Sequence, residues 1–342
     1  MGYRSSSRGN GVAGRYQIRY GRSRLELMIL CIGTTPAAQR VMVFGRLTLD
    51  AVNRARLSLD GAAGKSINVA KVLKALGEQP VATGFLGGDR GDEVRRELNA
   101  KSIESDFVSV AARTRQCVTV VDEASKAITE LVEESAPVTK GAFEELTLTI
   151  QRRIRGCQAA VMSGTLAPGG PVDFYRRCTE LGHQTGAISI LDAQGPPLLA
   201  ALLAKPALAK PNRAELAATM GQELSDEAAV IDAMRQLHER GAQRVVVTAG
   251  SGPILACDGK DVWRLHSPKI DPVNPIGSGD AFTAGLTSHL VRGADFGEAC
   301  RWGAAAGAAN ALTLMAGEVE RPTVERLAGL VTVMRIPKGG SR

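Results

Sequence analysis

The sequence of 342 residues lacks the long uncharged apolar stretch that a membrane-spanning helix requires. Such a helix needs about 18 or more consecutive apolar residues. The apolar runs that are present, such as "RVVVTAG" and "AAVMSG", have the length of buried strands instead. We therefore expect no membrane as a partner of this chain.

The sequence also lacks any C-x-x-C pair, which argues against a thiolate metal site. Its cysteines are scattered singly through apolar surroundings, a pattern typical of reduced core thiols in a cytoplasmic protein. They lie at positions 31, 117, 157, 178, 257 and 300.

Beyond its first 27 residues the chain has little excess charge. Residues 1–27 carry six arginines and one glutamate, so this segment supplies +5 of the net charge of +7. It is rich in Gly and Ser and lacks the apolar core of a secretory signal, which predicts a disordered basic tail. A misassigned start at Met28, an RNA-binding arm and a targeting segment stay open as its explanation. For the rest of the chain we expect no nucleic-acid partner.

From about residue 61, patterns typical of helices alternate with short β-rich runs. This alternation predicts a doubly wound α/β fold, with a mostly parallel sheet and helices on both faces, over residues 28–336. Two regions, about 37–60 and 114–136, contain short strands only and predict a small separate sheet that serves as a lid. No G-x-G-x-x-G follows the first strand, which argues against an NAD-dependent Rossmann enzyme.

The segment "GAAGKS" looks like a phosphate-binding Walker A loop, but its spacing fails. That motif requires a glycine five residues before the pair Gly64-Lys65, and position 59 is Leu59. Taken alone, Lys65 is typical of a solvated loop lysine.

The most informative stretch is "NPIGSGDAFTAG", residues 274–285. Apolar residues after Asp280 follow helical spacing, which puts Gly277, Ser278 and Gly279 at the N-terminus of a helix. Unpaired amide groups and the helix dipole favour an anion there. Asp280 either complements the dipole or accepts a proton from a hydroxyl while the amides hold a phosphoryl group. On the second interpretation the dipole keeps its carboxyl ionised.

Two further segments allow both a structural and a functional interpretation. "AKPNRAEL" opens a helix and puts Asn212 and Glu215 on one face. Their oxygens either orient magnesium or its waters or form a variant of the capping box. "VVVTAGSGP", residues 245–253, is a buried strand that ends in a glycine-rich turn.

Together, in this order, these segments resemble the ribokinase/PfkB family of carbohydrate kinases, and within it the branch that phosphorylates hexose phosphates. The resemblance covers nearly everything from Met28 onward. It implies a ribokinase-like fold with a small β-sheet lid. It also implies transfer of a phosphoryl group from ATP, with Mg²⁺, to a ketohexose phosphate such as fructose 1-phosphate, tagatose 6-phosphate or fructose 6-phosphate. A kinase of an unphosphorylated sugar or nucleoside and a non-catalytic sugar-binding regulatory protein stay open as alternatives.

The resemblance also implies roles for single residues. The segment 274–285 resembles the family's N-P-x-G-A-G-D-x-F-x-A-G, with Ser278 where alanine is usual, so Asp280 is implied as the base and residues 277–279 as an anion hole. On the side of ATP and magnesium, the implied residues are Lys210, Asn212, Glu215, Thr248, Gly250, Ser251, Gly252 and Asn310. On the side of the sugar phosphate, they are Gln39, Gly64, Lys65, Asn68, Arg115 and Ser163.

The departures from the family pattern lie on the sugar side. The branch opens with N-P-A-x-D, whose acid bonds sugar hydroxyls, whereas "TPAAQ" has Gln39 in that place. The first and third glycines of G-G-K-G are replaced by Ala63 and Ser66. Kinase activity is therefore better supported than any named sugar. We expect a cytoplasmic enzyme, and a homodimer formed through the lid sheet is one candidate assembly.

Overall fold

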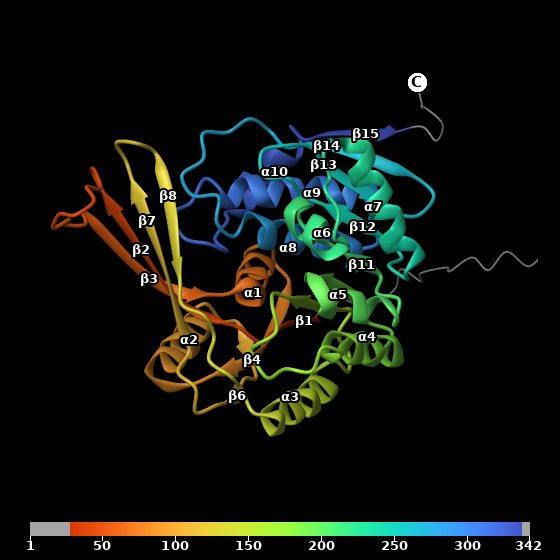
Figure 1. Cartoon of the computed structure of the whole chain (residues 1–342), viewed down its shortest axis with the longest axis horizontal. Coiled ribbons are helices and arrows are strands. Elements are labelled where there is room, and N and C mark those ends of the chain that lie inside the picture. The colour runs from red at the N-terminus through yellow and green to blue at the C-terminus, as the bar shows by residue number, and fades with distance from the viewer. Residues whose placement is uncertain (1–27, 337–342) are drawn as a thin grey trace, which may run out of the picture.

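The computed structural model describes residues 28–336, so the predicted tail of residues 1–27 lies outside the described residues. The described chain forms an 11-stranded sheet with helices on both faces and a separate 4-stranded sheet (Figure 1). Among these residues, no helix has both the length and the apolar character needed to cross a membrane.

The large sheet is mostly parallel and is centred on β1 (Met28–Gly33). This strand pairs in parallel with β4 (Gln79–Leu86) on one side and with β9 (Ala159–Ser163) on the other. The remaining strands are β5 (Glu104–Ser105), β6 (Val108–Ser109), β10 (Ile188–Asp192), β11 (Leu208–Ala209), β12 (Val245–Val247), β13 (Ile254–Cys257), β14 (Val262–His266) and β15 (Thr332–Ile336). The parallel ladder continues from β9 through β10 and β11 to β12, and β13, β14 and β15 complete the sheet as antiparallel strands.

The helices are α1 (Lys65–Ala75), α2 (Gly88–Ala100), α3 (Lys140–Arg153), α4 (Phe174–Thr185), α5 (Gly195–Leu202), α6 (Arg213–Met220), α7 (Glu227–Glu239), α8 (Ser278–Val291), α9 (Phe296–Asn310) and α10 (Arg321–Ala328). They cover both faces of the sheet because strand side chains alternate between two apolar cores. In β1, Ile29 and Cys31 enter the core shared with α1, α2, α8, α9 and α10. Leu30 and Ile32 enter the core shared with α3 to α7. The doubly wound fold predicted from the sequence is confirmed.

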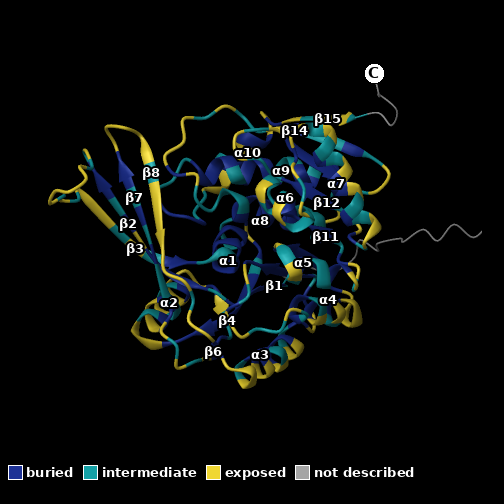
Figure 2. Ribbon diagram, viewed as in Figure 1, coloured by how far each residue is buried: buried dark blue, intermediate teal, exposed yellow. Residues whose placement is uncertain are grey.

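The second sheet has the strand order β3-β2-β7-β8 and is called the lid sheet below. It comprises β2 (Ala37–Phe44), β3 (Leu57–Ala63), β7 (Arg115–Asp122) and β8 (Ala127–Val132), from the two regions in which the sequence predicted a small sheet. The lid sheet projects to one side of the large sheet (Figure 1). Its inner strands β2 and β7 are mostly buried, whereas β8 is largely exposed (Figure 2).

Two glycines permit the close packing at the carboxyl ends of β1 and β4. Gly33 and Gly84 are register partners there. A Cβ on Gly84, which has φ +155°, would lie 1.8 Å from the Gly33 carbonyl oxygen. A Cβ on Gly33 would lie 2.2 Å from Oγ of Ser66, in the first turn of α1. The small size of both residues thus brings the start of α1 to the edge where the parallel strands end.

Replacing Gly84 with alanine is expected to lower the free energy of unfolding by about 1–3 kcal/mol, because the new methyl group overlaps backbone that cannot move away. Gly141, in the first turn of α3, is the matched control because an added Cβ there meets nothing within 4 Å. Gly141→Ala should leave the stability equal or raise it by up to about 1 kcal/mol. Urea unfolding of both variants measures the difference, and equal effects would contradict the close approach of β1 and β4.

Candidate active site

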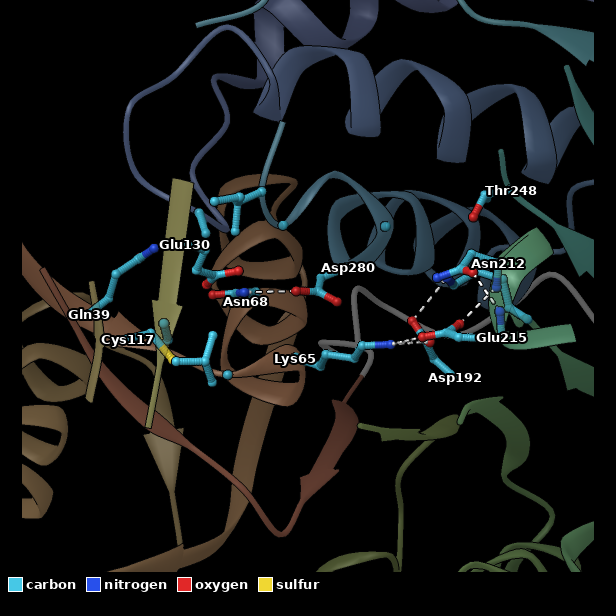
Figure 3. A pocket seen from close by; sticks show the side chains of 18 of the residues that line it. Gln39, Lys65, Asn68, Cys117, Glu130, Asp192, Asn212, Glu215, Thr248 and Asp280 are labelled. Carbon is cyan, nitrogen blue, oxygen red and sulfur yellow. Dashed lines mark hydrogen bonds and ion pairs between the residues drawn. The ribbon is translucent and has the colours of Figure 1, made fainter. Parts of the chain in front are cut away.

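A cleft of about 320 Å³ lies between the lid sheet and the carboxyl edge of the large sheet (Figure 3). The lid sheet contributes Gln39, Arg115, Cys117, Glu130 and Val132 to its wall. The opposite wall comes from the start of α1, the ends of β10 and β11, and the N-termini of α6 and α8. Its residues include Gly64, Lys65, Asn68, Asp192, Lys210, Asn212, Glu215, Thr248, Gly277, Gly279 and Asp280.

Asp280 lies in the first turn of α8 with 6% of its surface exposed. Its Oδ2 accepts a hydrogen bond of 2.7 Å from Nδ2 of Asn68 (Figure 3). Burial raises the pKa of Asp280 to about 7; Lys65, Asn68 and Lys210 lower it, and Asp192 raises it further. The expectation that the helix dipole keeps this carboxyl ionised is therefore wrong near neutral pH, where both forms are populated. A pKa near 7 suits a general base at physiological pH.

Asp192, at the end of β10, joins two lysines in the buried part of the cleft. Its Oδ1 accepts a hydrogen bond of 3.1 Å from Lys65 Nζ, and its Oδ2 lies 3.0 Å from Lys210 Nζ. Thr283 of α8 also donates to Oδ2, at 3.1 Å. Burial alone would raise the pKa of Asp192, but Lys210 and Lys65 hold it below its usual value. This carboxylate therefore stays ionised in the interior.

Lys65 reaches across the cleft and also lies 3.1 Å from Oε1 of Glu215. Burial would lower the pKa of its ammonium group, but Asp192, Glu215 and Asp280 raise it above the usual range. The interpretation of Lys65 as a solvated loop lysine is wrong, because its charge is shared between two carboxylates. Asp192, Glu215 and Asp280 together face the two ammonium groups of Lys65 and Lys210.

Asn212 and Glu215 form the capping box that the sequence allowed. Oδ1 of Asn212 accepts from the Glu215 amide at 2.8 Å, and Oε2 of Glu215 accepts from the Asn212 amide at 2.8 Å. The described residues hold no group of three or more His, Cys, Asp and Glu placed around one metal ion. The oxygen donors of Asn212, Glu215 and Asp192 nevertheless fit Mg²⁺, which keeps several waters and uses one or two protein carboxylates.

The loop before α8, where the sequence predicts an anion hole, turns sharply at Gly277. Gly277 caps the helix with φ 83°, and a Cβ there would lie 2.9 Å from Cβ of Ala316. The Ser278 amide is already used, since it donates to the Pro275 carbonyl at 3.1 Å. A Cβ on Gly279 would lie 3.8 Å from Lys210 Nζ, so a positive charge faces the start of the helix.

A second hollow of about 590 Å³ adjoins the cleft and shares Asn212 and Thr248 with it. Gly250 lines this hollow, and its predicted place beside a nucleotide stays a prediction. Ser251 and Gly252 belong to the same turn but line neither hollow.

Asn310 and Ser163, two further predicted residues, also lie outside both hollows. Asn310 is fully buried; it donates to the Ile276 carbonyl at 2.8 Å and accepts from the Gly317 amide at 2.8 Å. It fixes the loop before α8 and lines neither hollow. Ser163 is buried at the end of β9, and its hydroxyl has no hydrogen-bond partner among the described residues.

Sequence reasoning missed Asp192, Cys117 and Glu130. The signal for Asp192 is present in "SILDA", where an acid ends a buried strand, because carboxyl ends of parallel strands collect at one edge. Cys117 and Glu130 face the cleft from β7 and β8, and only strand register in the lid sheet reveals this. Burial raises the pKa of both side chains, with Arg115 opposing the shift at each.

Comparison with known proteins places the chain in a family. The profile of the pfkB family carbohydrate kinases matches residues 27–322. The chain belongs to the pfkB family. This result confirms the predicted enzyme class, a carbohydrate kinase.

Solved structures of pfkB kinases and their relatives share the fold. Escherichia coli phosphofructokinase-2 in complex with potassium is 25% identical, with a TM-score of 0.81, over 89% of this chain and 98% of that chain. A possible 1-phosphofructokinase from Thermotoga maritima is 24% identical, with a TM-score of 0.84, over 91% and 100%. Arabidopsis thaliana ribokinase complexed with ribose and ATP is 19% identical, with a TM-score of 0.73, over 89% and 98%. The predicted ribokinase-like fold is confirmed.

The raised pKa of Asp280 predicts a stability cost that grows with pH. The folded chain holds a proton up to about pH 7, whereas the ordinary pKa of this group is 3.8. The stability gained from that bound proton is complete below the ordinary pKa and is lost as the pH rises through the folded pKa. Asp280→Asn removes this loss, so the Tm of the variant relative to the parent should rise from about pH 5 to about pH 7 and level off above that.

Asp295→Asn is the control for this measurement. Asp295 is an exposed aspartate whose side chain caps α9, and asparagine caps a helix equally well. Its Tm difference from the parent should stay constant across the same range. Calorimetry measures the Tm of both variants and of the parent across this pH range. A Tm difference between Asp280→Asn and the parent that does not change with pH would refute the raised pKa.

Proposed function

We propose that this pfkB kinase transfers the γ-phosphoryl group of ATP to a hydroxyl of a ketohexose phosphate, such as fructose 1-phosphate, tagatose 6-phosphate or fructose 6-phosphate. One observation carries the proposal: a buried carboxyl with a pKa of about 7 shares a cleft with cationic side chains from both walls. Asp280 supplies the base, and Arg115 and Lys65 supply the positive charge that a phosphorylated acceptor requires.

In the proposed reaction, Asp280 accepts the proton of the acceptor hydroxyl as that oxygen attacks the γ-phosphorus. The bond from phosphorus to the β,γ-bridging oxygen breaks, and ADP leaves with the electron pair. The N-terminus of α8 and the ammonium group of Lys210 stabilise the charge on the transferring group. Positioning and electrostatic stabilisation account for catalysis of this kind.

We assign the nucleotide to the second hollow, beside Thr248 and Gly250, with its phosphates directed toward α8. Asn212 and Glu215 would hold Mg²⁺ beside these phosphates. When bound, this ion would neutralise part of the phosphate charge.

We assign the phosphate of the acceptor to Arg115. Nε and Nη2 of Arg115 donate to the Thr35 carbonyl at 3.3 Å and 3.1 Å, which orients the guanidinium at the cleft wall. Gln39 suits a sugar hydroxyl, because its buried Oε1 has no hydrogen-bond partner among the described residues. Escherichia coli phosphofructokinase-2, similar to this chain, has been solved in complex with fructose-6-phosphate, which supports a phosphorylated acceptor.

We also propose that the exposed face of the lid sheet binds a second copy of the chain. Leu131 of β8 is 56% exposed, and Leu49 and Val52 in the loop after β2 are exposed as well. These exposed apolar side chains lie on the lid sheet and on the loop that joins its strands β2 and β3, and exposed apolar surface favours an interface. A tetrameric form of Escherichia coli phosphofructokinase-2 is known, which supports an assembly built by this family.

Leu131→Asp should shift the protein to the monomer, because it buries a carboxylate in the proposed interface. Leu148→Asp on α3 is the matched control, since Leu148 is also 56% exposed but lies away from the lid sheet. Light scattering at micromolar concentration measures the mass of each variant. A monomeric parent, or an unchanged mass for Leu131→Asp, would refute the lid interface.

The kinase proposal is tested by measuring ADP release from ATP and Mg²⁺ with a panel of ketose phosphates and free sugars. At least one ketohexose phosphate should be turned over. Asp280→Asn should lose at least about 10²-fold of kcat with that acceptor, because general-base catalysis contributes about this much. Arg115→Ala should raise KM for the sugar phosphate about tenfold or more and leave KM for ATP unchanged.

Arg113→Ala is the control for Arg115, because Arg113 pairs with Asp89 at 2.6 Å on the surface and does not line the cleft. This variant should behave like the parent. Saturation by an unphosphorylated sugar, with no sugar phosphate turned over, would favour the ribokinase-like alternative. An Asp280→Asn enzyme with nearly full kcat would refute the assignment of the base.

A further inference from the structure

The loop of residues 311–317 lies between the lid sheet and the catalytic residues. On the lid side, Met315 is buried among lid valines that include Val41 and Val121. On the catalytic side, Ala316 is in contact range of Gly277, where an added Cβ would approach Ala316 to 2.9 Å. Neighbouring residues of this loop thus touch the lid sheet and the anion hole.

The next residue of the loop determines the space available to Asn68. Gly317 has φ +73°, and a Cβ there would lie 2.7 Å from Cα of Asn68 and 3.1 Å from its Oδ1. Asn68 in turn donates the 2.7 Å hydrogen bond to Asp280. A shift of Gly317 therefore moves the group that orients the catalytic carboxyl.

One buried lysine connects this loop to the lid sheet. Lys71 of α1 is 4% exposed, and its Nζ donates to the Ala316 carbonyl at 2.8 Å and to the Ala62 carbonyl at 3.1 Å. Ala62 belongs to β3, two residues before Gly64 at the cleft. Glu97 of α2 accepts a hydrogen bond from the Ala62 amide, and its Oε1 lies 4.0 Å from Lys71 Nζ.

The environment of Lys71 is unusual for a residue with only a packing role. Burial lowers the pKa of its ammonium group, Glu97 and Glu318 oppose the shift, and Lys101 adds to it. Burying a charge is costly unless strong partners compensate. A methionine of similar length could fill the same space, but it could not bond two carbonyls on separate segments.

We propose that Lys71 is a positioning residue that fixes the end of the lid sheet and residues 314–317 relative to each other. The cleft wall formed by the lid sheet, the anion hole and the pair Asn68 and Asp280 are thereby held in one arrangement. Lys71 itself does not line the cleft. The activity readout below rests on the proposed kinase function, whereas the exchange readout does not.

Hydrogen exchange of the full chain tests the connection without any substrate. Lys71→Met should speed amide exchange in segments 57–64 and 311–320 together, because both lose the same partner. Lys71→Arg, which keeps a cation with several donors, should exchange nearly as the parent does. Lys74→Met is the matched control, since Lys74 lies on the same helix but is only half-buried. Faster exchange confined to α1, or in only one of the two segments, would overturn the proposal.

Kinetics distinguish positioning from a structural role. A small displacement of catalytic groups can cost about 10²-fold in rate, so Lys71→Met should lose kcat by about that factor while KM for ATP stays within about twofold. In the pH profile of kcat/KM, the acid limb of Lys71→Met should move to higher pH. The reason is that loss of the Asn68 hydrogen bond raises the pKa of Asp280. Lys71→Arg should restore both values.

If Lys71 had only a structural role, Lys71→Met would lower the Tm and the fraction of active enzyme. The acid limb of the pH profile of kcat/KM would then stay unchanged. If Lys71→Met does not fold, Met315→Ala removes the lid contact of the same loop without burying a charge, and it should move exchange and the acid limb in the same direction. An unchanged limb in Met315→Ala would then overturn the proposal. Should the parent turn over no acceptor, the proposed function fails while the exchange result still decides the role of Lys71.

Discussion

The cleft depends on one buried carboxylate, Asp192, and on the two lysines that share it. An ionised carboxylate in the interior is tolerated only where cations and hydrogen-bond donors compensate for the lost water. Lys65 arrives from the start of α1, Lys210 from the end of β11, and Thr283 from α8. Because these three partners must converge, the interaction brings the ends of separate elements to one point. The part of the cleft around Asp192 is formed by this convergence.

The same arrangement explains why a local rule failed for Asp280. A helix dipole favours an acid in the first turn by about 0.3–1 kcal/mol. Burial in a cleft that already holds Asp192 acts in the opposite direction and dominates, which raises the pKa to about 7. The effect of the helix dipole can be predicted from the sequence, because it depends only on residues that adjoin Asp280 along the chain. The burial of Asp280 cannot be predicted in this way, because it is produced by α1 and by the loop beside Gly277.

Much of the fold follows from the sequence because strands and helices carry their own periodicity. The alternation after residue 61 predicted the parallel sheet, and the two polar strand regions predicted the lid sheet. Motifs within one segment also came together, as Asn212 and Glu215 do at the N-terminus of α6. Contacts between segments were not predictable in this way. Asn310 was expected beside the nucleotide but fixes a loop, and Asp192 was overlooked because a single acid after a strand has no local partner.

The cleft draws on positions from Gln39 to Ala316, with α1 packed against α8 in the finished fold. During synthesis, the first of these helices is complete long before the second exists. At about 5–20 residues per second, the 216 residues between the end of α1 at Ala75 and the end of α8 at Val291 take about 11–43 s to make. The face of α1 that packs against α8 has no native cover during that interval, whereas β1 and β4, which adjoin α1 in the chain, cover another part of the helix. The nascent chain is thus exposed to aggregation, and to chaperone binding, for most of its translation.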